Sequence, residues 1–223
     1  MGIVMELIFK TKKQELGGIY SFIFTPVKEM QWIAGQTIGL ELETEFLTEE
    51  RHFTISSAPY EKDIVITTQV SSSDFKQALD MLEPGDKAGA FAIAGGDFVW
   101  EDKPSVFIAG GMGITPYFSI LKQLAHERRD VERIQLFYSA KKEKLLFKKE
   151  LQQLAEKIKN VNINFFIDER ISIGRIEKQI NNLENKKIYI AGPSKMVDDF
   201  SDELVKKFHI KEEDFKRDWF TGL

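Results

Sequence analysis

The sequence predicts two kinds of domain in series, an antiparallel β-barrel followed by an α/β domain built on a parallel sheet. Three observations support this prediction. The first half of the chain consists of short apolar runs separated by turn residues, which is typical of small antiparallel barrels. From Pro104 onward, apolar runs alternate with helical patterns, which is typical of a parallel sheet covered on both faces. The 223 residues suffice for two domains of roughly 100 residues each, and we place these domains at residues 1–102 and 103–223.

Six strands and one helix are expected in the first domain. The strands are predicted at residues 5–9, 19–24, 37–42, 51–55, 64–70 and 87–93. Gly17–Gly18 indicates a hairpin between the first two strands. Apolar residues recur at helical spacing from Phe75 to Leu82, directly after three serines, which predicts a helix that begins there. The acidic segment 43–50 is expected to be an exposed loop.

The second domain is predicted to alternate strands and helices. Strands are expected at residues 106–109, 134–138, 161–167 and 187–191, with 215–220 as a final edge strand. Helical patterns are expected at residues 116–128, 145–158, 175–183 and 195–208. This order predicts a sheet whose carboxyl edge is available for ligands.

Composition excludes several kinds of chemistry. The chain has no cysteine, which excludes disulfides, thiolate zinc sites, cysteine-ligated iron–sulfur clusters and cysteine nucleophiles. Its three histidines are widely separated, so we expect no metal site. The net charge is −4 with acids and bases interspersed, so we expect neither nucleic acid nor a membrane surface as a partner. With no leader pattern and no long apolar segment, the expected location is the cytoplasm.

The segment Ser105–Pro116 is predicted to form a strand, a glycine turn and a helix. Gly110, Gly111 and Gly113 allow a tight turn and close approach of a ligand, and Pro116 suits the first turn of a helix. Free amides at a helix N-terminus favour a phosphate or a diphosphate. An ordinary tight turn between a strand and a helix explains the same pattern.

The segment Arg51–Pro59 carries a second signal. Arg51 and Phe53 are two residues apart in a predicted strand, so both side chains lie on one face. A guanidinium beside an aromatic ring suits a ligand with a phosphate at one end and a flat ring at the other. Thr54 adds a hydroxyl next to the ring. A half-buried barrel strand with an arginine that reaches into solvent is the alternative.

These segments resemble motifs of the ferredoxin–NADP reductase superfamily. Arg51–Pro59 resembles its flavin motif, which reads Arg, any residue, Tyr or Phe, then Ser or Thr. Ser105–Pro116 resembles its pyridine-nucleotide motif. Trp32–Gln36, Pro84–Asp86 and Ile190–Pro193 resemble further segments of the superfamily, and all five occur in its order. The resemblance implies an FAD-binding barrel followed by an NAD(P)-binding α/β domain.

The resemblance assigns roles at the flavin. It implies that Arg51 pairs with the FAD diphosphate, that Phe53 stacks on the isoalloxazine, and that Thr54 bonds near flavin N5. Ser72 and Ser73, at the start of the predicted helix, would meet the same diphosphate, although Ser73 or Asp74 could equally serve as a helix N-cap. Further FAD contacts are assigned to His52, Thr67 and Thr68. Two diphosphate-binding elements favour FAD, and FMN stays open.

The resemblance also assigns the nucleotide site. The residues implied are Gly110, Gly111, Gly113, Ile114, Thr115, Pro116, Tyr138, Ser139, Gly192, Pro193 and Met196. Phe53, Thr54 and Thr115 are the residues expected at the reacting rings, and we designate them catalytic. Ser139, followed by lysines at 141, 142 and 144, favours the 2′-phosphate of NADPH, but such lysines are often only solvated, and NADH stays open.

Two positions depart from the superfamily pattern. Ala191 stands where many members have cysteine, which removes a polar contact near the nicotinamide. The carboxyl end, Trp219–Leu223, lacks the terminal tyrosine that covers the flavin in some members. Phe220 or Trp219 could shield the ring instead, or both could simply pack the last strand.

The implied activity is hydride transfer from NADPH or NADH to flavin N5, then electron transfer to an acceptor. Since the chain cannot carry an iron–sulfur cluster of its own, the acceptor is expected to be external, with a small ferredoxin or flavodoxin first. One alternative is a reductase of free flavin or quinone, or the reductase component of an oxygenase. Another is a non-catalytic electron-transfer or nucleotide-sensing subunit.

Overall fold

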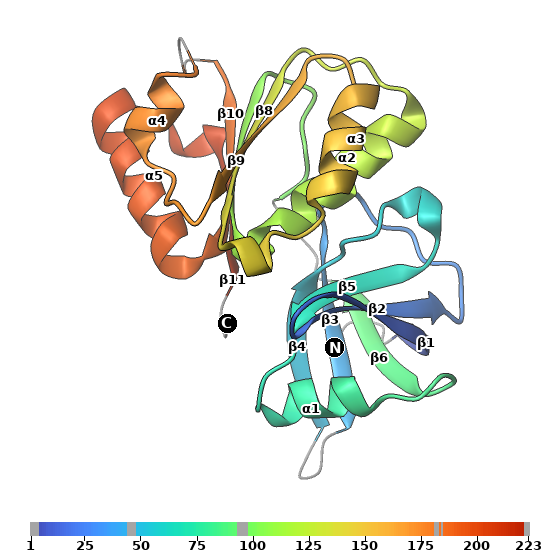
Figure 1. The fold of residues 1–223 in the computed structure, drawn as a ribbon. Coiled ribbons are helices and arrows are strands. Elements are labelled where there is room, and N and C mark those ends of the chain that lie inside the picture. Colours follow the sequence, from blue (N-terminus) through green and yellow to red (C-terminus); the bar gives the residue numbers. More distant parts are fainter. Residues whose placement is uncertain (1–4, 44–47, 93–97, 181–182, 184, 221–223) are drawn as a thin grey trace.

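The computed structural model describes residues 5–43, 48–92, 98–180, 183 and 185–220, which form two sheets. The first sheet holds six antiparallel strands in the order β4-β3-β6-β1-β2-β5. Its strands are β1 (Met5–Leu16), β2 (Ile19–Pro26), β3 (Thr37–Glu43), β4 (Thr48–Thr54), β5 (Ile64–Gln69) and β6 (Lys87–Ala92). A single bridge between Ile55 and Ile66 links the two outer strands, so the sheet curls into a barrel. Helix α1 (Asp74–Met81) lies across one end of it (Figure 1).

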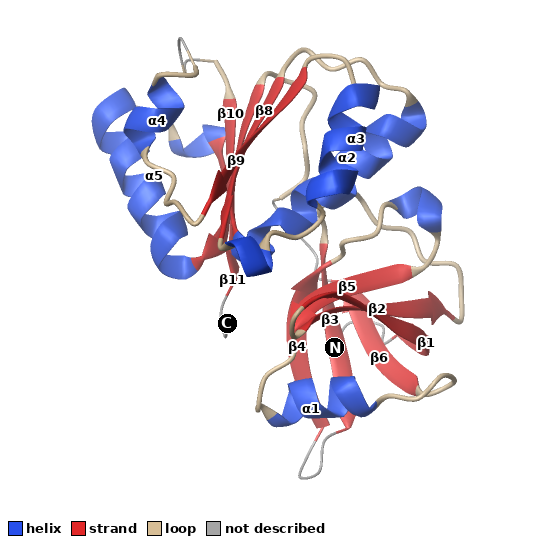
Figure 2. Ribbon diagram, viewed as in Figure 1, coloured by secondary structure: helices blue, strands red, loops and turns tan. Residues whose placement is uncertain are grey.

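The second sheet is fully parallel, as the sequence predicts. Its order is β11-β10-β7-β8-β9. The strands are β7 (Ser105–Gly110), β8 (Ile134–Ala140), β9 (Val161–Ile167), β10 (Lys187–Pro193) and β11 (Phe215–Phe220). Figure 2 shows α2 (Thr115–Glu127) and α3 (Lys148–Lys157) on one face, with α4 (Ile173–Glu177) and α5 (Ser194–Phe208) on the other. None of the helices in the described ranges is long and apolar enough to cross a bilayer.

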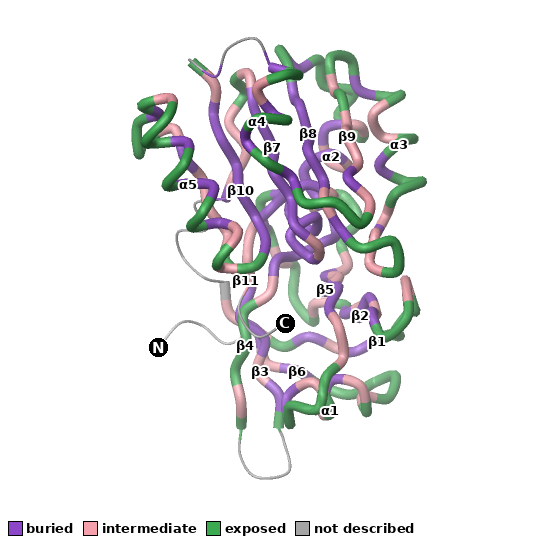
Figure 3. Tube along the Cα trace, turned by 60° about the vertical axis from the view of Figure 1, so that its left-hand side comes forward, coloured by how far each residue is buried: buried purple, intermediate pink, exposed green. Residues whose placement is uncertain are grey.

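Burial follows this layering. Every residue of β7 is buried, because helices cover both faces of the central strands (Figure 3). One apolar cluster lies between the sheet and α2 with α3, and a second lies between the sheet and α4 with α5. A third cluster, rich in phenylalanine, fills the barrel. The predicted fold class is therefore confirmed, and the predicted boundary at residues 102 and 103 falls between β6 and β7.

Several predicted boundaries are wrong. Strand β1 continues to Leu16 because its polar second half pairs with β2 around the Gly17–Gly18 turn. Strand β4 begins at Thr48, so the end of the predicted loop 43–50 is strand, and residues 44–47 lie outside the described residues. Helix α3 begins three residues late because Phe147 has a left-handed backbone, with φ 56°.

The helix predicted at 175–183 is also misplaced. It is the short α4, Ile173–Glu177, and residues 181 and 182 of the prediction lie outside the described residues. Residue 93, predicted to end the sixth strand, and residues 221–223 of the carboxyl end lie outside them as well. The predicted glycine turn contains one element more than expected, the 3₁₀ turn η2 (Gly111–Ile114), before α2 begins.

Polar contacts join the two domains along α2. Ser119 donates to the carbonyl of Ser57 at 2.6 Å, and the backbone N–H of Gly35 donates to the Ser119 hydroxyl at 3.4 Å. Lys122 forms an ion pair with Glu61, which lies in the 3₁₀ turn η1 (Pro59–Glu61). Since these partners come from two separate barrel segments, the one before β3 and the connection between β4 and β5, they fix how the barrel sits against the second sheet.

Candidate active site between the barrel and the parallel sheet

A small cavity lies where the barrel meets the carboxyl edge of the parallel sheet. Barrel strands β4 and β5, helix α1, turn η2, the start of α2 and strand β11 all contribute to its wall. Its lining residues are Thr37, His52, Phe53, Thr54, Thr67, Thr68, Lys76, Met112, Thr115, Asp218 and Phe220. Seven of the predicted cofactor residues, those at positions 52, 53, 54, 67, 68, 115 and 220, thus meet at one place.

A hydrogen bond across this cavity joins the two domains. The hydroxyl of Thr54, at the end of β4, donates to Oδ2 of Asp218 in β11 at 2.8 Å. Burial raises the pKa of the Asp218 carboxyl above its ordinary value, and the Thr54 hydrogen bond lowers it by less. A carboxyl with a raised pKa at a site shared by both domains can exchange a proton closer to neutral pH.

Aromatic and cationic groups gather beside this pair. Phe53 packs against Phe75 of α1, with ring centroids 5.8 Å apart. The Arg51 guanidinium lies 5.7 Å from the Phe75 ring, so Arg51 and Phe53 share one face of β4, as predicted. Lys76 lies 4.5 Å from the Phe53 ring. The arrangement provides a flat apolar surface with positive charge at one end.

Other predicted hydroxyls already have protein partners. Thr67 bonds the hydroxyls of Ser21 and Ser56, each at 2.8 Å, inside the barrel. The Thr115 hydroxyl donates to the carbonyl of Met112 at 3.2 Å within the η2 turn. These two side chains line the cavity, but their hydroxyls are engaged in hydrogen bonds that hold the cavity wall together.

The three serines before α1 are exposed. Ser73 is the N-cap residue, with extended backbone, and its hydroxyl makes no capping hydrogen bond within the described chain. The Gln77 side chain instead donates to the carbonyl of Ser72 at 3.2 Å. Of the two N-cap candidates from the sequence, Ser73 therefore holds the N-cap position and Asp74 is the first residue of the helix.

A second cavity, of about 520 Å³, opens at the carboxyl ends of β7, β8 and β10. The predicted residues that line it are Gly110, Gly111, Ser139, Pro193 and Met196. Gly111 has φ +54° and open space where a Cβ would stand, so its backbone faces the cavity freely. This is the edge at which open α/β sheets bind ligands.

Five other predicted nucleotide residues lie in the packed interior. Ile114, Pro116 and Tyr138 are buried, and the Tyr138 hydroxyl accepts a hydrogen bond from the N–H of Leu146 at 3.0 Å. Gly113 packs against the β10 backbone, where an added Cβ would stand 2.1 Å from the carbonyl oxygen of Ala191. Gly113 therefore allows η2 to pack closely against β10. The sequence suggested instead that this glycine leaves room for a ligand. Gly192, also buried, lies between Met196 and Gly110.

At the carboxyl end, the structure distinguishes the two aromatic candidates. Phe220 lines the small cavity. Trp219 is 48% exposed, and its indole donates to Asp198 on α5 at 2.9 Å. Asp218, which the sequence analysis missed, lies two residues before Phe220 and lines the same cavity. The alternation of side chains along the last strand was the sequence signal that could have found Asp218. Lys76, Met112 and Arg170 also line the two cavities, and no pattern in the sequence pointed to them.

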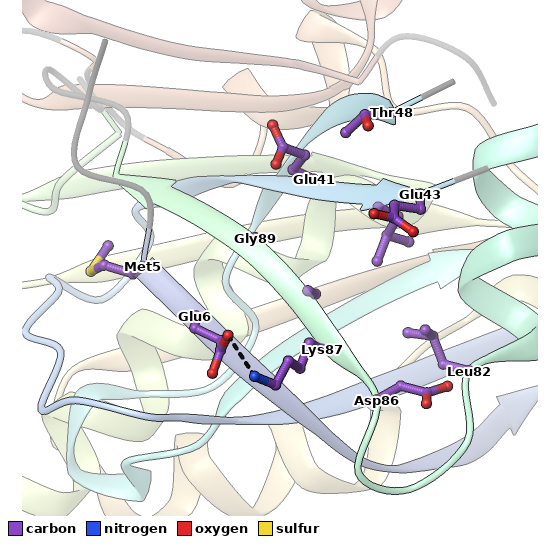
Figure 4. Close-up of a pocket in the computed structure, with 11 residues that line it drawn as sticks. Met5, Glu6, Glu41, Glu43, Thr48, Leu82, Asp86, Lys87 and Gly89 are labelled. Atoms are coloured by element: carbon purple, nitrogen blue, oxygen red, sulfur yellow. Dashed lines mark ion pairs between the residues drawn. The ribbon is translucent and has the colours of Figure 1, made fainter. Parts of the chain in front are cut away.

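A hollow of about 560 Å³ lies elsewhere, against strands β1, β3 and β6 of the barrel (Figure 4). Acidic side chains dominate it, and Glu6 pairs with Lys87 at 3.1 Å. None of the predicted site residues lines it, so its size alone does not make it the functional site.

The side chains at the domain junction fit a flavin dinucleotide. Aromatic rings at Phe53 and Phe220 suit a tricyclic ring, and Arg51 with Lys76 suits a diphosphate. The small cavity measures about 100 Å³, below the roughly 300 Å³ at which ligand sites begin. Lining side chains must therefore move to seat the ring.

Residues 107–202 match the family described as "Oxidoreductase NAD-binding domain". Flavohemoprotein A of Dictyostelium discoideum is 26% identical over 231 residues, which cover 93% of this chain and 58% of that protein. NADH-cytochrome b5 reductase 2 of Meyerozyma guilliermondii is 29% identical, covering 77% of this chain and 66% of that protein. The chain thus spans about three fifths of the length of the Dictyostelium relative.

Solved structures share the whole fold. The flavohem-like FAD/NAD binding domain of nitric oxide dioxygenase from Vibrio cholerae has a TM-score of 0.81 and 20% identity, covering 97% of this chain and 98% of that chain. Ferredoxin-NADP+ reductase from Plasmodium falciparum has a TM-score of 0.79 and 19% identity, covering 97% and 96%.

A barrel that faces the carboxyl edge of a parallel sheet, with a cavity between them, is the fold that this chain shares with the flavohem-like FAD/NAD binding domain and with ferredoxin-NADP+ reductase. Residues 107–202 are an oxidoreductase NAD-binding domain, and the whole chain has the fold of ferredoxin-NADP+ reductase. The family description of residues 107–202 makes NAD the nucleotide of this domain.

Proposed function

We propose that this chain takes hydride from NAD(P)H through FAD and passes the electrons to a separate one-electron carrier protein. The observation that carries the proposal is the Thr54–Asp218 hydrogen bond, because it joins the flavin strand to the nucleotide domain at one cavity. FAD, when bound, supplies the conversion between two-electron and one-electron transfer.

The side chains around the cavity have distinct tasks in this proposal. Phe53 and Phe220 bound the ring site and exclude water from it. Thr54 presents a hydroxyl that the Asp218 carboxyl orients as its hydrogen-bond acceptor, and burial raises the pKa of that carboxyl. Gly110 and Gly111 leave the carboxyl edge of β7 open to the nucleotide.

We propose a haem protein as the electron acceptor and rank a ferredoxin or flavodoxin second. Two relatives support this order, since one is a flavohemoprotein and the other an NADH-cytochrome b5 reductase. The chain covers only part of the flavohemoprotein, so a haem carrier would be a separate protein or a separate segment. Ferredoxin remains the competitor because a ferredoxin-NADP+ reductase shares the fold.

An anaerobic titration tests the reductase. The full chain, loaded with FAD, is mixed separately with NADH and NADPH while flavin absorbance is followed. We expect rapid bleaching by at least one nucleotide, then reoxidation by cytochrome b5 faster than by ferredoxin. Bound FAD that neither nucleotide bleaches would instead support the non-catalytic subunit, and turnover with free flavin or quinone alone would support the small-molecule reductase.

Nucleotide preference is proposed to depend on Arg170 rather than on the lysines after β8. Lys144 donates to Gln69 of the barrel at 3.0 Å, and Ser139 donates to the carbonyl of Glu169 at 2.5 Å. Arg170 lines the nucleotide cavity, and a guanidinium suits a phosphate.

If NADPH is the substrate, Arg170→Ala will raise its KM by about tenfold or more, the value of a charge-assisted hydrogen bond, and leave the KM for NADH unchanged. Lys142→Ala is the control, since Lys142 does not line the cavity. Equal effects of the two substitutions on NADPH would contradict the assignment to Arg170.

A further inference from the structure

Lys76 is a cation in an unusual position. It follows Phe75 in α1, is half-buried, and lines the flavin cavity. Its Nζ donates to the hydroxyl of Thr68 and lies 4.5 Å from the centre of the Phe53 ring. No carboxylate of the described residues forms an ion pair with it; Asp80, one turn further along α1, pairs with Lys12 at 2.6 Å.

The surroundings of Lys76 disfavour its protonated, positively charged form. Burial, and to a smaller extent repulsion from Arg51 on β4, lowers the pKa of Lys76 to about 8. His52 of β4 and Asp218 of β11 line the same cavity, but His52 bonds Glu50 at 2.6 Å and Asp218 bonds Thr54. A half-buried cation beside a second cation, with no carboxylate partner among the described residues, is a candidate site for an anion.

We propose that Lys76 is a second cation for the FAD diphosphate, acting beside Arg51. Arg51 is partly engaged, with Glu49 at 2.5 Å and the carbonyl of Glu50 at 2.8 Å. Lys76 extends the positive surface from β4 to α1, near the N-terminus of that helix, where the dipole also favours an anion. The assignment rests on the proposed function because it requires FAD at this junction.

Flavin binding tests the assignment. The full chain, stripped of flavin, is titrated with FAD and with riboflavin, which lacks phosphate, for wild type, Lys76→Met and Lys76→Arg. We expect Lys76→Met to raise the Kd for FAD by about tenfold or more, with little change for riboflavin, because only FAD presents a charge-assisted partner. Lys76→Arg keeps the charge and should bind FAD nearly as wild type does. Lys148→Met is the matched control, since Lys148 lies 5.7 Å from the Phe165 ring in the other domain.

A second readout does not need flavin. The folded pKa of Lys76 is below its ordinary value of 10.5, so between about pH 8 and 10.5 the unfolded chain binds more protons there than the folded chain. The flavin-free wild type should therefore gain stability relative to Lys76→Met as the pH rises through this window. Measured by thermal unfolding, the difference between the two proteins should level off above the window.

The outcomes separate the two proposals. Equal losses of FAD and riboflavin affinity would overturn the diphosphate role and place Lys76 at the ring, and an unchanged Kd for FAD in Lys76→Met would overturn it outright. A wild-type chain that takes up no FAD would instead overturn the proposed function.

Discussion

Replacing Gly113 with alanine will destabilise the folded chain by about 3 kcal/mol, the upper range for an added methyl in a packed site. The new Cβ would stand 2.1 Å from the Ala191 carbonyl oxygen and 2.6 Å from the Gly192 nitrogen. Both atoms belong to the backbone of β10, so no side chain can rotate away. Denaturant unfolding of the full chain, with the midpoint and slope both fitted, measures the loss.

Two other glycines provide matched controls. Gly111→Ala meets nothing within 4 Å but keeps φ +54°, so it should cost about 1 kcal/mol of backbone strain. Gly174→Ala, with open space and no positive φ, should cost nothing measurable. A loss for Gly113→Ala no larger than that for Gly111→Ala would show that η2 and β10 can separate without penalty.

The glycine turn illustrates what the sequence could and could not predict. The strand and helix on either side of it follow from local apolar spacing and from Pro116, and both are confirmed. The task of Gly113 depends on Ala191 and Gly192, which lie far along the chain and reach it only because β10 pairs with β7. Local pattern could not separate a glycine that packs from one that faces a ligand.

Strand β4, which carries Arg51 and Phe53, also shows what the sequence could and could not predict. Period-two spacing correctly placed Arg51 and Phe53 on one face of β4. The position of Lys76 could not be predicted, because a lysine on an amphipathic helix is ordinarily solvated. Only the packing of α1 against β4 brings Lys76 over the Phe53 ring. The segment 43–50 was misjudged for the opposite reason: Glu49 and Glu50 looked like loop residues, but pairing with β3 overrides their low strand propensity.

Asp218→Asn will slow the reduction of bound flavin by NAD(P)H by about tenfold, because a neutral amide oxygen replaces the charged acceptor that orients the Thr54 hydroxyl. The substitution keeps the shape of the side chain and its bond with Thr54 but removes the titrating carboxyl. Anaerobic stopped-flow absorbance between pH 5 and 8 measures the rate, and the variant should lose whatever pH dependence the wild type shows there. Asp198→Asn, at a carboxylate that accepts a hydrogen bond from Trp219 outside both cavities, should behave as wild type.

Thr54→Val tests whether the two residues act as a unit. The valine keeps the volume of Thr54 but leaves the Asp218 carboxylate without its hydroxyl donor, so the pKa of Asp218 should rise further. Because each residue works through the other, the double variant with Thr54→Val and Asp218→Asn should reduce bound flavin only a little more slowly than either single variant.

Stability should change in the opposite direction from activity. The raised pKa means that above pH 3.8 the folded chain binds more protons at Asp218 than the unfolded chain, so this carboxyl costs stability as the pH rises through its folded pKa. Asp218→Asn removes that cost and should unfold at a higher temperature than wild type at pH 7, with a smaller difference at pH 4. A variant that is both slower and less stable at pH 7 would mean that Asp218 mainly holds β11 against the barrel. A gain in stability with a loss of rate would identify a carboxyl retained for its chemistry.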